Sequence, residues 1–487
     1  MTHAPSMGHI RLCVFVMLVA LCAPAALSQP APETPSADAH WYVIDAGDAH
    51  IGYAWQQHTN DGDSARTVTV QALSWQERGS PPSQTSDTTT VTEDASGRPL
   101  TIETNSNTGD AWTHTRAEIH PGRALVSRTT ATSQWSGDVQ LPAGVRFDDG
   151  AELLRNWDPA QSPKLEFDNF SLDAMGVEHV VMAAAHAENP IIALRLRYQG
   201  AALVGVARLT IDHREIVDVA RPMFGVTVHV RSADAQAALT AHAPYEVLPN
   251  AMTRAPYRIS STQTLGHVRY RFSFRDGLTF PLPRTGEQRA IVDENTATID
   301  VCRTCGEGLG ADPATLADAL RATAWLQSDD RRLRAIAAPV GHMPLSGERK
   351  MQMLMRRAQP YFARIDFVGH YSALETLSRH AGDCTEAAVL LAALGRAAGI
   401  PTRVASGLVY SRQAYHGVSN AFLPHSWTLA YVDGRWKSFD LALENFDSTH
   451  IALTVGDGDE TSIAAASQLA SLLLLDDMAE VRTRSRS

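Results

Sequence analysis

A capped, strongly apolar helix beginning at Cys384 constrains the fold more than any other feature of the sequence. Asp383 followed three residues later by Glu386 is a capping box, in which the first side chain accepts a hydrogen bond from an N–H of the first turn and the second accepts one from the N–H of the capping residue. Apolar residues recur at helical spacing over positions 387–398, and Gly399-Ile400-Pro401 ends the pattern. We therefore expect a buried helix whose first residue is a cysteine.

A thiol at the start of a helix favours nucleophilic chemistry. The peptide dipoles and free N–H groups at a helix N-terminus stabilise an anion, so we expect them to lower the pKa of Cys384 and to hold an oxyanion. A thiol attacks a carbonyl as thiolate, which requires a nearby base whose imidazole is oriented by a further group. A lone cysteine in an apolar helix is usually an inert core residue, so the partners decide between the two interpretations.

A predicted hairpin supplies such partners. Residues 425–432 have a β-strand pattern, Asp433-Gly434 is a hairpin turn signal, and residues 435–440 are expected to return as the second strand. His425 and Asp440 lie at nearly equal distances from the turn, so we expect them roughly opposite each other across the ladder. One carboxylate is thereby placed beside one imidazole.

Other residues compete for these roles. His450 and His416 are alternative bases, although a structural or exposed position explains each of them more simply. Asp433 is an alternative acid, but the Asp-Gly turn already accounts for it. Trp427 and Trp436 are expected to pack in the core or to wall a cleft.

Taken together, these motifs resemble the transglutaminase-like superfamily, which shares a papain-like Cys-His-Asp arrangement. The similar segments are Ser372-Ala373-Leu374, Gly382-Asp383-Cys384, Ala398-Gly399-Ile400-Pro401-Thr402-Arg403, His425-Ser426-Trp427, Trp436 and Asp440. The resemblance implies Cys384 as nucleophile, His425 as general base and then acid, and Asp440 as the group that orients it. It also implies a nucleophile helix packed on an antiparallel sheet. Two departures affect local turn geometry and substrate fit: Leu441-Ala442 stands where Pro-Thr is common, and Ser426 where Ala or Val is common.

The N-terminus has the pattern of an export signal. The first ten residues carry no acidic side chain, Arg11 supplies a positive charge, and residues 12–21 form an apolar run too short to span a membrane comfortably. Small residues predict cleavage after Ser28, so residues 1–28 are expected to be a signal peptide and the mature protein periplasmic or secreted. Cys22 offers a lipoprotein alternative, which the bulky residue before it disfavours.

Composition narrows the class of protein further. With 487 residues, 44% of them hydrophobic and 20% charged, the chain is typical of a globular protein of two or three domains. The formal net charge of −11 repels polyanions, so nucleic acid is not an expected partner. The apolar run at residues 469–475 is too short to cross a bilayer, and no stable membrane span is expected.

Cysteine usage fits an oxidising compartment. Two of the five cysteines, Cys13 and Cys22, lie in the predicted signal, which leaves three. Cys302 and Cys305 are expected to form a local disulfide, with Cys384 left free. A redox motif and a zinc site stay open as alternatives, but glycines follow the pair where a redox helix would begin, and no two further zinc ligands are evident nearby.

The fold class expected is α+β, with a β-rich N-terminal region. Residues 40–301 are rich in alternating patterns and turn signals, and they predict an antiparallel β-rich domain. Within it, residues 267–275 form the clearest strand, with four apolar side chains on one face. Residues 302–345 are expected to be a linker with helices, and residues 346–487 the transglutaminase-like catalytic domain.

The function expected is that of an exported thiol enzyme acting on amide bonds of proteins or peptides. His425 takes the Cys384 proton, the sulphur attacks a carbonyl, and water or an amine resolves the thioester. This chemistry needs no metal and no organic cofactor, so neither is expected. Hydrolysis is favoured because no second nucleophile site is evident. A cross-linking transglutaminase and a non-catalytic binding or envelope-assembly module are the alternatives.

Overall fold

A computed structural model describes most of the chain after residue 32. The described residues are 33–76, 82–109, 111–223, 225–240, 245–246, 248–362, 364–365, 370–413 and 418–481. Residues 34–487 belong to one compact unit. The predicted signal peptide, residues 1–28, and the alternative base His416 lie outside the described residues. Within the described part of the chain, no helix combines the length and apolar character needed to cross a membrane.

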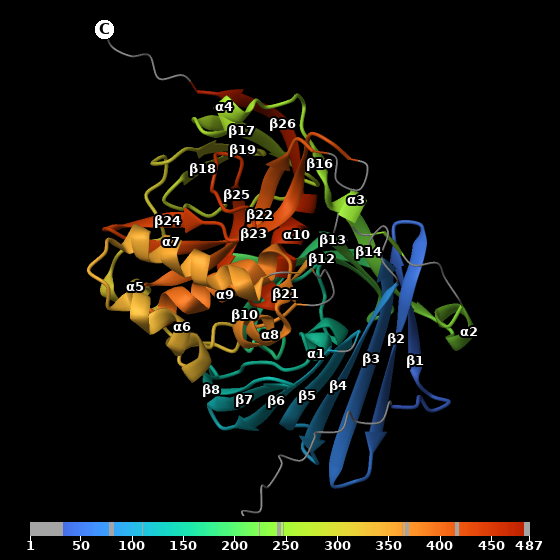
Figure 1. The fold of residues 1–487 in the computed structure, drawn as a ribbon. Helices are drawn as coiled ribbons and strands as arrows, with labels where there is room; N and C mark the ends of the chain where they lie inside the picture. The colour runs from blue at the N-terminus through green and yellow to red at the C-terminus, as the bar shows by residue number, and fades with distance from the viewer. Residues whose placement is uncertain are drawn as a thin grey trace, which may run out of the picture. The chain divides into compact units, whose positions relative to one another are not determined.

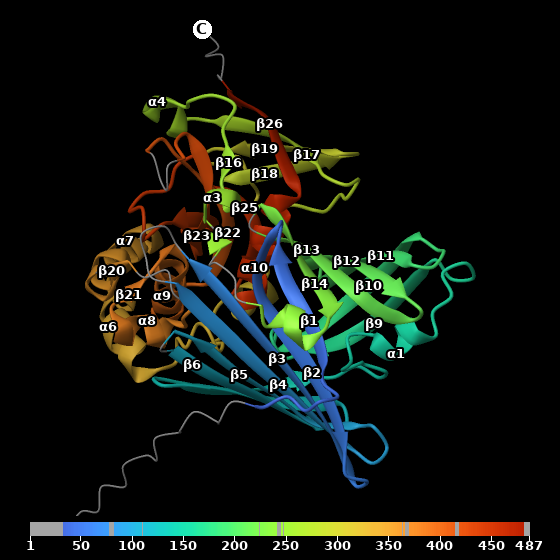
Figure 2. The same ribbon diagram turned by 90° about the vertical axis from the view of Figure 1, so that its right-hand side faces the viewer.

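A fifteen-stranded sheet, antiparallel apart from the short β15, occupies the N-terminal half (Figures 1 and 2). Its strands are β1 (His40–Ala46), β2 (Ala49–Asn60), β3 (Ser64–Gln76), β4 (Ser83–Asp94), β5 (Pro99–Thr108), β6 (Ala111–His120), β7 (Arg123–Thr130), β8 (Gln134–Gln140), β9 (Lys164–Ser171), β10 (Gly176–His186), β11 (Ile191–Gln199), β12 (Ala202–Asp212), β13 (Glu215–Met223), β14 (Val226–Ala233) and β15 (Tyr245–Glu246). Successive hairpins run from β1 out to the edge strand β8. The chain then crosses to the other edge at β9 and returns strand by strand, so that β14 pairs with β1.

The two edges of this sheet curl toward each other. The segment after β8 pairs with β9, because Arg146 N donates to Asp168 O and Phe170 N donates to Arg146 O, both at 2.8 Å. Phe170 also belongs to an apolar cluster with Ile102 of β5 and Val126 of β7. Strands far apart in the sheet order therefore share one core.

The C-terminal half combines helices with three further sheets, one of which has only two short strands. A five-stranded sheet has the order β16-β23-β22-β25 with β24 beside β23, and a four-stranded sheet has the order β18-β19-β17-β26. The strands are β16 (Thr253–Arg254), β17 (Val268–Phe274), β18 (Gln288–Asp293), β19 (Thr296–Val301), β20 (Arg364–Ile365), β21 (Ala381–Gly382), β22 (Thr402–Ser411), β23 (Ala421–Val432), β24 (Arg435–Phe439), β25 (Ile451–Gly456) and β26 (Leu473–Glu480). The short strands β20 and β21 pair with each other in parallel.

Helix α9 is the centre of the helical layer beside β22 and β23 (Figure 1). Over the whole described part of the chain, the helices are α1 (Ala151–Arg155), α2 (Ala235–Ala238), α3 (Leu248–Ala251), α4 (Ser261–Thr264), α5 (Pro313–Asp318), α6 (Arg331–Gly341), α7 (Gly347–Ala358), the 3-10 turn η1 (Gln359–Tyr361), α8 (Ala373–Arg379), α9 (Cys384–Ala397) and α10 (Glu460–Ser471). Helices α6, α7 and α8 pack against α9, and α10 contacts both the large sheet and the five-stranded sheet.

The strand predicted at residues 267–275 is present as β17, and its alternate residues are buried as expected. It pairs with β19 and with the C-terminal strand β26 rather than with the large sheet. The predicted local disulfide is also present, between Cys302 and Cys305, directly after β19. The boundaries predicted at residues 301 and 346 stay predictions.

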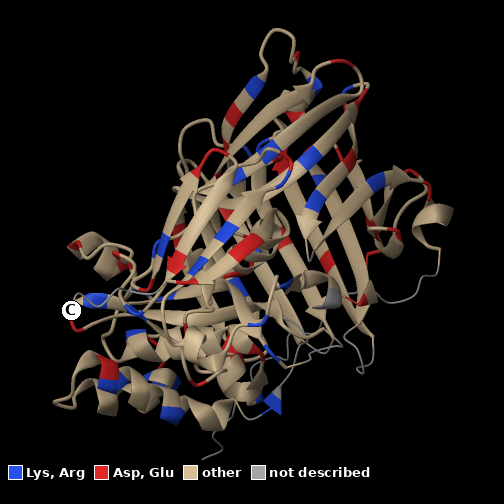
Figure 3. Ribbon diagram, turned by 90° about the horizontal axis from the view of Figure 1, so that it is seen from above, with Lys and Arg blue, Asp and Glu red and all other residues tan. Residues whose placement is uncertain are grey.

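Buried polar contacts join the large sheet to the helical half. Arg128 of β7 donates from Nη1 to Glu375 Oε2 of α8 at 3.2 Å, and both side chains are buried. The same guanidinium lies 4.1 Å from the ring centre of Trp325. Gln468 of α10 accepts a hydrogen bond from Val206 N of β12 at 2.9 Å. Acidic and basic residues are interspersed along the strands rather than segregated by sign (Figure 3).

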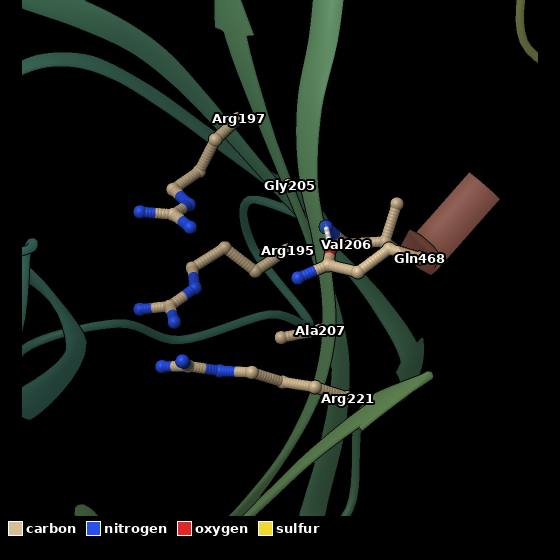
Figure 4. Close-up of a pocket in the computed structure, with 7 residues that line it drawn as sticks. All are labelled: Arg195, Arg197, Gly205, Val206, Ala207, Arg221 and Gln468. Atoms are coloured by element: carbon tan, nitrogen blue, oxygen red, sulfur yellow. Dashed lines mark hydrogen bonds between the residues drawn. The ribbon is translucent and has the colours of Figure 1, made fainter. Parts of the chain in front are cut away.

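Three arginines, which we call the arginine cluster, line a small pocket on the large sheet (Figure 4). Arg195 and Arg197 come from β11 and Arg221 from β13, and the strand between them carries Gly205 and Ala207. The register pairs Arg195 with Ala207 and Arg197 with Gly205. Small residues on the middle strand thus leave room for three long side chains on one face.

Carboxylates neutralise part of this cluster. Arg197 Nη1 lies 3.3 Å from Glu178 Oε2, and Arg195 forms an ion pair with Asp149. Among the described residues, none forms an ion pair or hydrogen bond with Arg221. Burial and the charges of Arg195 and Arg197 lower the pKa of Arg221 to about 10.

Candidate active site

Helix α9 begins at Cys384, as predicted. The Asp383 side chain accepts a hydrogen bond from a first-turn N–H at 2.7 Å, and Glu386 Oε2 accepts one from Asp383 N at 2.9 Å, so the capping box is present. The helix is buried almost along its whole length. It is fixed to β23 by a hydrogen bond from Thr428 Oγ1 to Ala388 O at 2.9 Å. The sequence thus places a cysteine at a rigid, buried position.

The predicted hairpin is formed by β23 and β24. Asp433 and Gly434 have φ values of 52° and 84°, the left-handed conformations of a tight hairpin turn. Both carboxylate oxygens of Asp433 accept from backbone N–H groups at the start of α7, so this residue holds the turn and is not part of the site. Beyond the ladder, His425 Nε2 and Asp440 Oδ2 lie 2.6 Å apart, and both side chains are buried.

Asp440 has four hydrogen-bonding partners. Its Oδ1 accepts from the backbone N–H groups of Ala442 and Leu443, each at 2.9 Å. Its Oδ2 contacts His425 Nε2 and, at 3.0 Å, His450 Nε2. Burial alone would raise the pKa of Asp440, but the hydrogen bonds and charges of the two histidines outweigh it and hold the pKa well below its usual range. Asp440 is therefore an ionised, fixed carboxylate.

His450 belongs to the site without replacing His425. The sequence suggested it only as an alternative base, whereas the structure places both imidazoles on one carboxylate. Burial would lower the pKa of His450, but its hydrogen bonds to Asp440 and Asp447 raise the pKa to about 9. Its position directly before β25 gave no sequence signal for this role.

Cys384 is a free, half-buried cysteine at the same site. Its sulphur takes a hydrogen bond from the backbone N–H of Ser426 and makes none to His425 directly among the described contacts. Burial and the charge of Asp383 raise the pKa of Cys384 well above its usual range, although the Ser426 N–H acts in the opposite direction. The expectation that the helix N-terminus would lower this pKa is therefore wrong, because burial is the larger effect.

The hydrogen bond to Asp440 determines which ring nitrogen of His425 carries the hydrogen. Nε2 is hydrogen-bonded to the ionised Asp440, so it carries the hydrogen of the neutral imidazole. Nδ1 is then the ring nitrogen that keeps a lone pair. The structure thus brings His425 and Asp440 together directly, and it places Cys384 against the residue that follows His425 in β23.

Aromatic rings surround the histidines. Trp427 is 2% exposed; its ring stacks near His425, with centroids 6.2 Å apart, and meets His450 edge-on at 5.1 Å. Trp436 is also 2% exposed, and its Nε1 donates to Gly310 O at 2.6 Å. Both tryptophans pack in the core, one of the two roles expected for them.

Two groups of side chains in the described residues are close enough to hold a metal ion: His425, Asp440 and His450, and His267, Cys302 and Cys305. The second group offers no thiolate, because its cysteines are joined as a disulfide. In the first group, both imidazole nitrogens are already hydrogen-bonded to the carboxylate, and a metal would have to displace both bonds. The donor set is better suited to moving protons than to holding a metal.

Comparison with known proteins gives a family for this part of the chain. Residues 342–441 match the model of the transglutaminase-like superfamily. No curated protein matches the chain. Among solved structures, a β-barrel-like protein from Brucella abortus with a domain of unknown function is 12% identical, with 40% of this chain and 95% of that chain covered and a TM-score of 0.33.

Two other solved structures are similar to the chain at a comparable level. A candidate cysteine protease from Cytophaga hutchinsonii is 15% identical, with 44% of this chain and 86% of that chain covered and a TM-score of 0.27. The periplasmic domain of TgpA from Pseudomonas aeruginosa, bound to ethylmercury, is 14% identical, with 40% and 89% covered and a TM-score of 0.27. The chain has an α+β fold in which a large N-terminal antiparallel sheet precedes the domain matched by the family model. Its C-terminal part contains a transglutaminase-like domain, matched over residues 342–441.

Proposed function

We propose that the protein is an exported thiol enzyme that hydrolyses amide bonds in proteins or peptides, with Cys384, His425 and Asp440 as its catalytic triad. The observation that carries the proposal is the 2.6 Å hydrogen bond between His425 Nε2 and Asp440 Oδ2, buried beside a free cysteine. The match of residues 342–441 to the transglutaminase-like superfamily model supports thiol chemistry at this place in the fold. The export signal pattern of residues 1–28 and the disulfide between Cys302 and Cys305 support an oxidising compartment.

The reaction proceeds through a thioester. His425 Nδ1 takes the Cys384 proton as the sulphur attacks the amide carbonyl, which forms the carbon–sulphur bond and a tetrahedral oxyanion. The proton then passes from His425 to the leaving nitrogen as the carbon–nitrogen bond breaks. Water, deprotonated by His425, attacks the thioester, and the carbon–sulphur bond breaks to return the thiol. The backbone N–H of Cys384, at the start of α9, is one donor to the oxyanion.

The resting form of the nucleophile follows from its surroundings. Because burial and Asp383 raise the pKa of Cys384, the sulphur rests as a thiol at neutral pH. Attack then requires proton transfer to His425 in the same step rather than a preformed thiolate. The site is consequently expected to be slow with small alkylating reagents and dependent on His425 for substrate attack.

Mass spectrometry of reaction products tests the proposal. The mature protein is incubated with a mixture of unfolded proteins, and new N-termini are compared with those produced by Cys384→Ser. We expect new termini with the unchanged protein and none with Cys384→Ser, whose circular dichroism and melting temperature serve as folding controls. Equal cleavage by both proteins would contradict the nucleophile assignment.

The same experiment separates the alternative functions. Isopeptide cross-links with release of ammonia, in place of new termini, would identify an acyl transfer to amines. Neither product, together with a Cys384 that no acyl substrate labels, would identify a module that keeps the fold without turnover.

A further inference from the structure

We propose that His450 is a positioning residue of this active site, a buried imidazolium that shares the Asp440 carboxylate with His425 and thereby offsets the negative charge that His425 faces when it takes the Cys384 proton. The inference rests on the proposed function, since it takes His425 to be that base. His425 Nε2 and His450 Nε2 contact the same oxygen, Asp440 Oδ2, at 2.6 and 3.0 Å. A site with one base needs one imidazole on the carboxylate, so the second requires an explanation.

The hydrogen bonds of His450 define its protonation state. Its Nε2 faces the ionised Asp440, and its Nδ1 faces Asp447 Oδ1 at 3.2 Å and Asp447 O at 3.1 Å. The backbone N–H of Asp447 also points at Nδ1 and could donate to it only if that nitrogen kept its lone pair. This contact is the longest of the three, at 3.4 Å, so the two oxygens are the closer partners of Nδ1. An imidazole nitrogen that faces an oxygen acceptor carries a hydrogen, and here both nitrogens do. His450 is therefore a cation, in agreement with its raised pKa.

The surroundings of this cation are largely apolar. The charged or titratable groups that face it are Asp440, Asp447 and His425, whose ring centre lies 5.5 Å away. The rings of Trp427 and Phe446 cover its other sides, at 5.1 and 4.7 Å between centroids. Because His425, Asp440 and His450 are buried, little water separates them, and their charges act on one another strongly.

The cation changes what Asp440 does to His425. A carboxylate alone beside His425 would favour its protonated form, and an imidazolium next to Cys384 would in turn stabilise the thiolate. The positive charge of His450 offsets the Asp440 charge and repels a second cation on His425. The site is thereby held as a neutral imidazole and a thiol, which is the starting state for proton transfer during attack.

A purely structural role is the competing explanation. His450 and Asp440 lie at the two ends of the loop between β24 and β25, so their hydrogen bond closes that loop. Glutamine at position 450 retains an N–H donor for Asp440 but carries no charge. His450→Gln therefore separates the effect of the charge from that of the hydrogen bond.

The pH profile of iodoacetamide labelling at Cys384 tests the inference on the full mature protein. We expect the inflection to move down by about one pH unit in His450→Gln, which makes labelling at neutral pH about tenfold faster. His229→Gln is the matched control, because His229 Nδ1 pairs with Asp218 Oδ2 at 2.9 Å on the large sheet, and it should leave the profile unchanged. In a His425→Ala background, the effect of His450→Gln should disappear.

Each outcome decides between the two proposals. If His425→Ala changes the profile but folded His450→Gln does not, the inference is overturned and the triad stands. If His425→Ala leaves the profile unchanged, the triad fails and the inference fails with it. Should His450→Gln not fold, Asp447→Asn weakens the same cation through its Nδ1 contact and should move the inflection in the same direction by a smaller amount.

Discussion

Two groups of buried and half-buried polar side chains in this molecule pair with their carboxylate partners in opposite ways. The group proposed for catalysis comprises Cys384, His425, Asp440 and His450, and we call it the catalytic cluster; in it, two imidazoles converge on a single carboxylate oxygen. In the arginine cluster, Arg195 and Arg197 each have a separate carboxylate partner, and no described residue pairs with Arg221. The shared carboxylate couples the protonation of the two histidines. The separate ion pairs of the arginine cluster mainly offset positive charge.

The difference follows from the chemistry of the side chains. A histidine changes charge within a few pH units of neutrality, so a carboxylate that contacts two of them can control where a proton resides. An arginine, even Arg221 with its lowered pKa, keeps its charge at neutral pH, so it is not suited to exchanging a proton in catalysis. We therefore expect changes in the catalytic cluster to affect reactivity, and changes in the arginine cluster to affect the free energy of unfolding.

The largest expected effect is on turnover. His425→Ala should lower the rate of amide hydrolysis by about 10²–10⁴-fold, because it removes the general base. Arg221→Met, in the arginine cluster, should leave that rate within about threefold, since nothing places it in the reaction. Initial rates at matched concentrations of folded protein measure both. A comparable loss in both variants would mean that the two clusters are not functionally separate.

The second expected effect is that the free energy of unfolding depends on pH through His450 of the catalytic cluster. The pKa of His450 in the folded protein is about 9, above the ~6.5 of an unfolded histidine. The corresponding stabilisation is complete below pH ~6.5 and is lost as the pH rises through about 9, a change of about 3 kcal/mol in the free energy of unfolding. Urea denaturation across this range should show the loss in the unchanged protein and little of it in His450→Gln. Equal slopes in the two proteins would argue against a buried imidazolium.

The sequence alone predicts some members of these two clusters and misses others, and the reason is physical. The helix at Cys384 and the hairpin that carries His425 and Asp440 have local signals: a capping box, helical spacing and an Asp-Gly turn. The role of His450 has none, because it depends on how the loop after β24 returns to the sheet. The raised pKa of Cys384 was missed as well, since burial is a property of tertiary packing that a helix N-terminus does not reveal.

The β-rich region predicted at residues 40–301 shows the same limit. Alternation predicted its strands, and β17 has its apolar face where the pattern placed it. The pairing of β17 with β26, however, joins residues about two hundred positions apart, and no local signal specifies such a partner. The arginine cluster likewise depends on a cross-strand register that places Arg195 and Arg197 beside Ala207 and Gly205.

A third expected effect concerns an ion pair of the arginine cluster. Arg197→Met leaves the Glu178 carboxylate, 1% exposed, without its cation, and should cost about 2–3 kcal/mol in the free energy of unfolding at neutral pH. Burial already raises the pKa of Glu178, and loss of Arg197 raises it further, so the cost should shrink as the pH falls and the carboxyl takes up a proton. Adding Glu178→Gln should recover most of the stability. Denaturation at pH 5 and pH 8 checks the sign, and a cost that grows on acidification would contradict it.

The smallest effect is expected at Arg221, and its sign is the opposite of that at Arg197. Because no described residue pairs with Arg221, its guanidinium bears the cost of burial and the repulsion of Arg195 and Arg197, which is why its pKa falls to about 10. Methionine keeps much of the side-chain volume without the charge, so Arg221→Met should leave the free energy of unfolding unchanged or raise it by up to about 1 kcal/mol. Urea midpoints of Arg221→Met and Arg197→Met, measured side by side, make the comparison directly. A loss of stability in Arg221→Met as large as that in Arg197→Met would show that Arg221 has an anionic partner in solution.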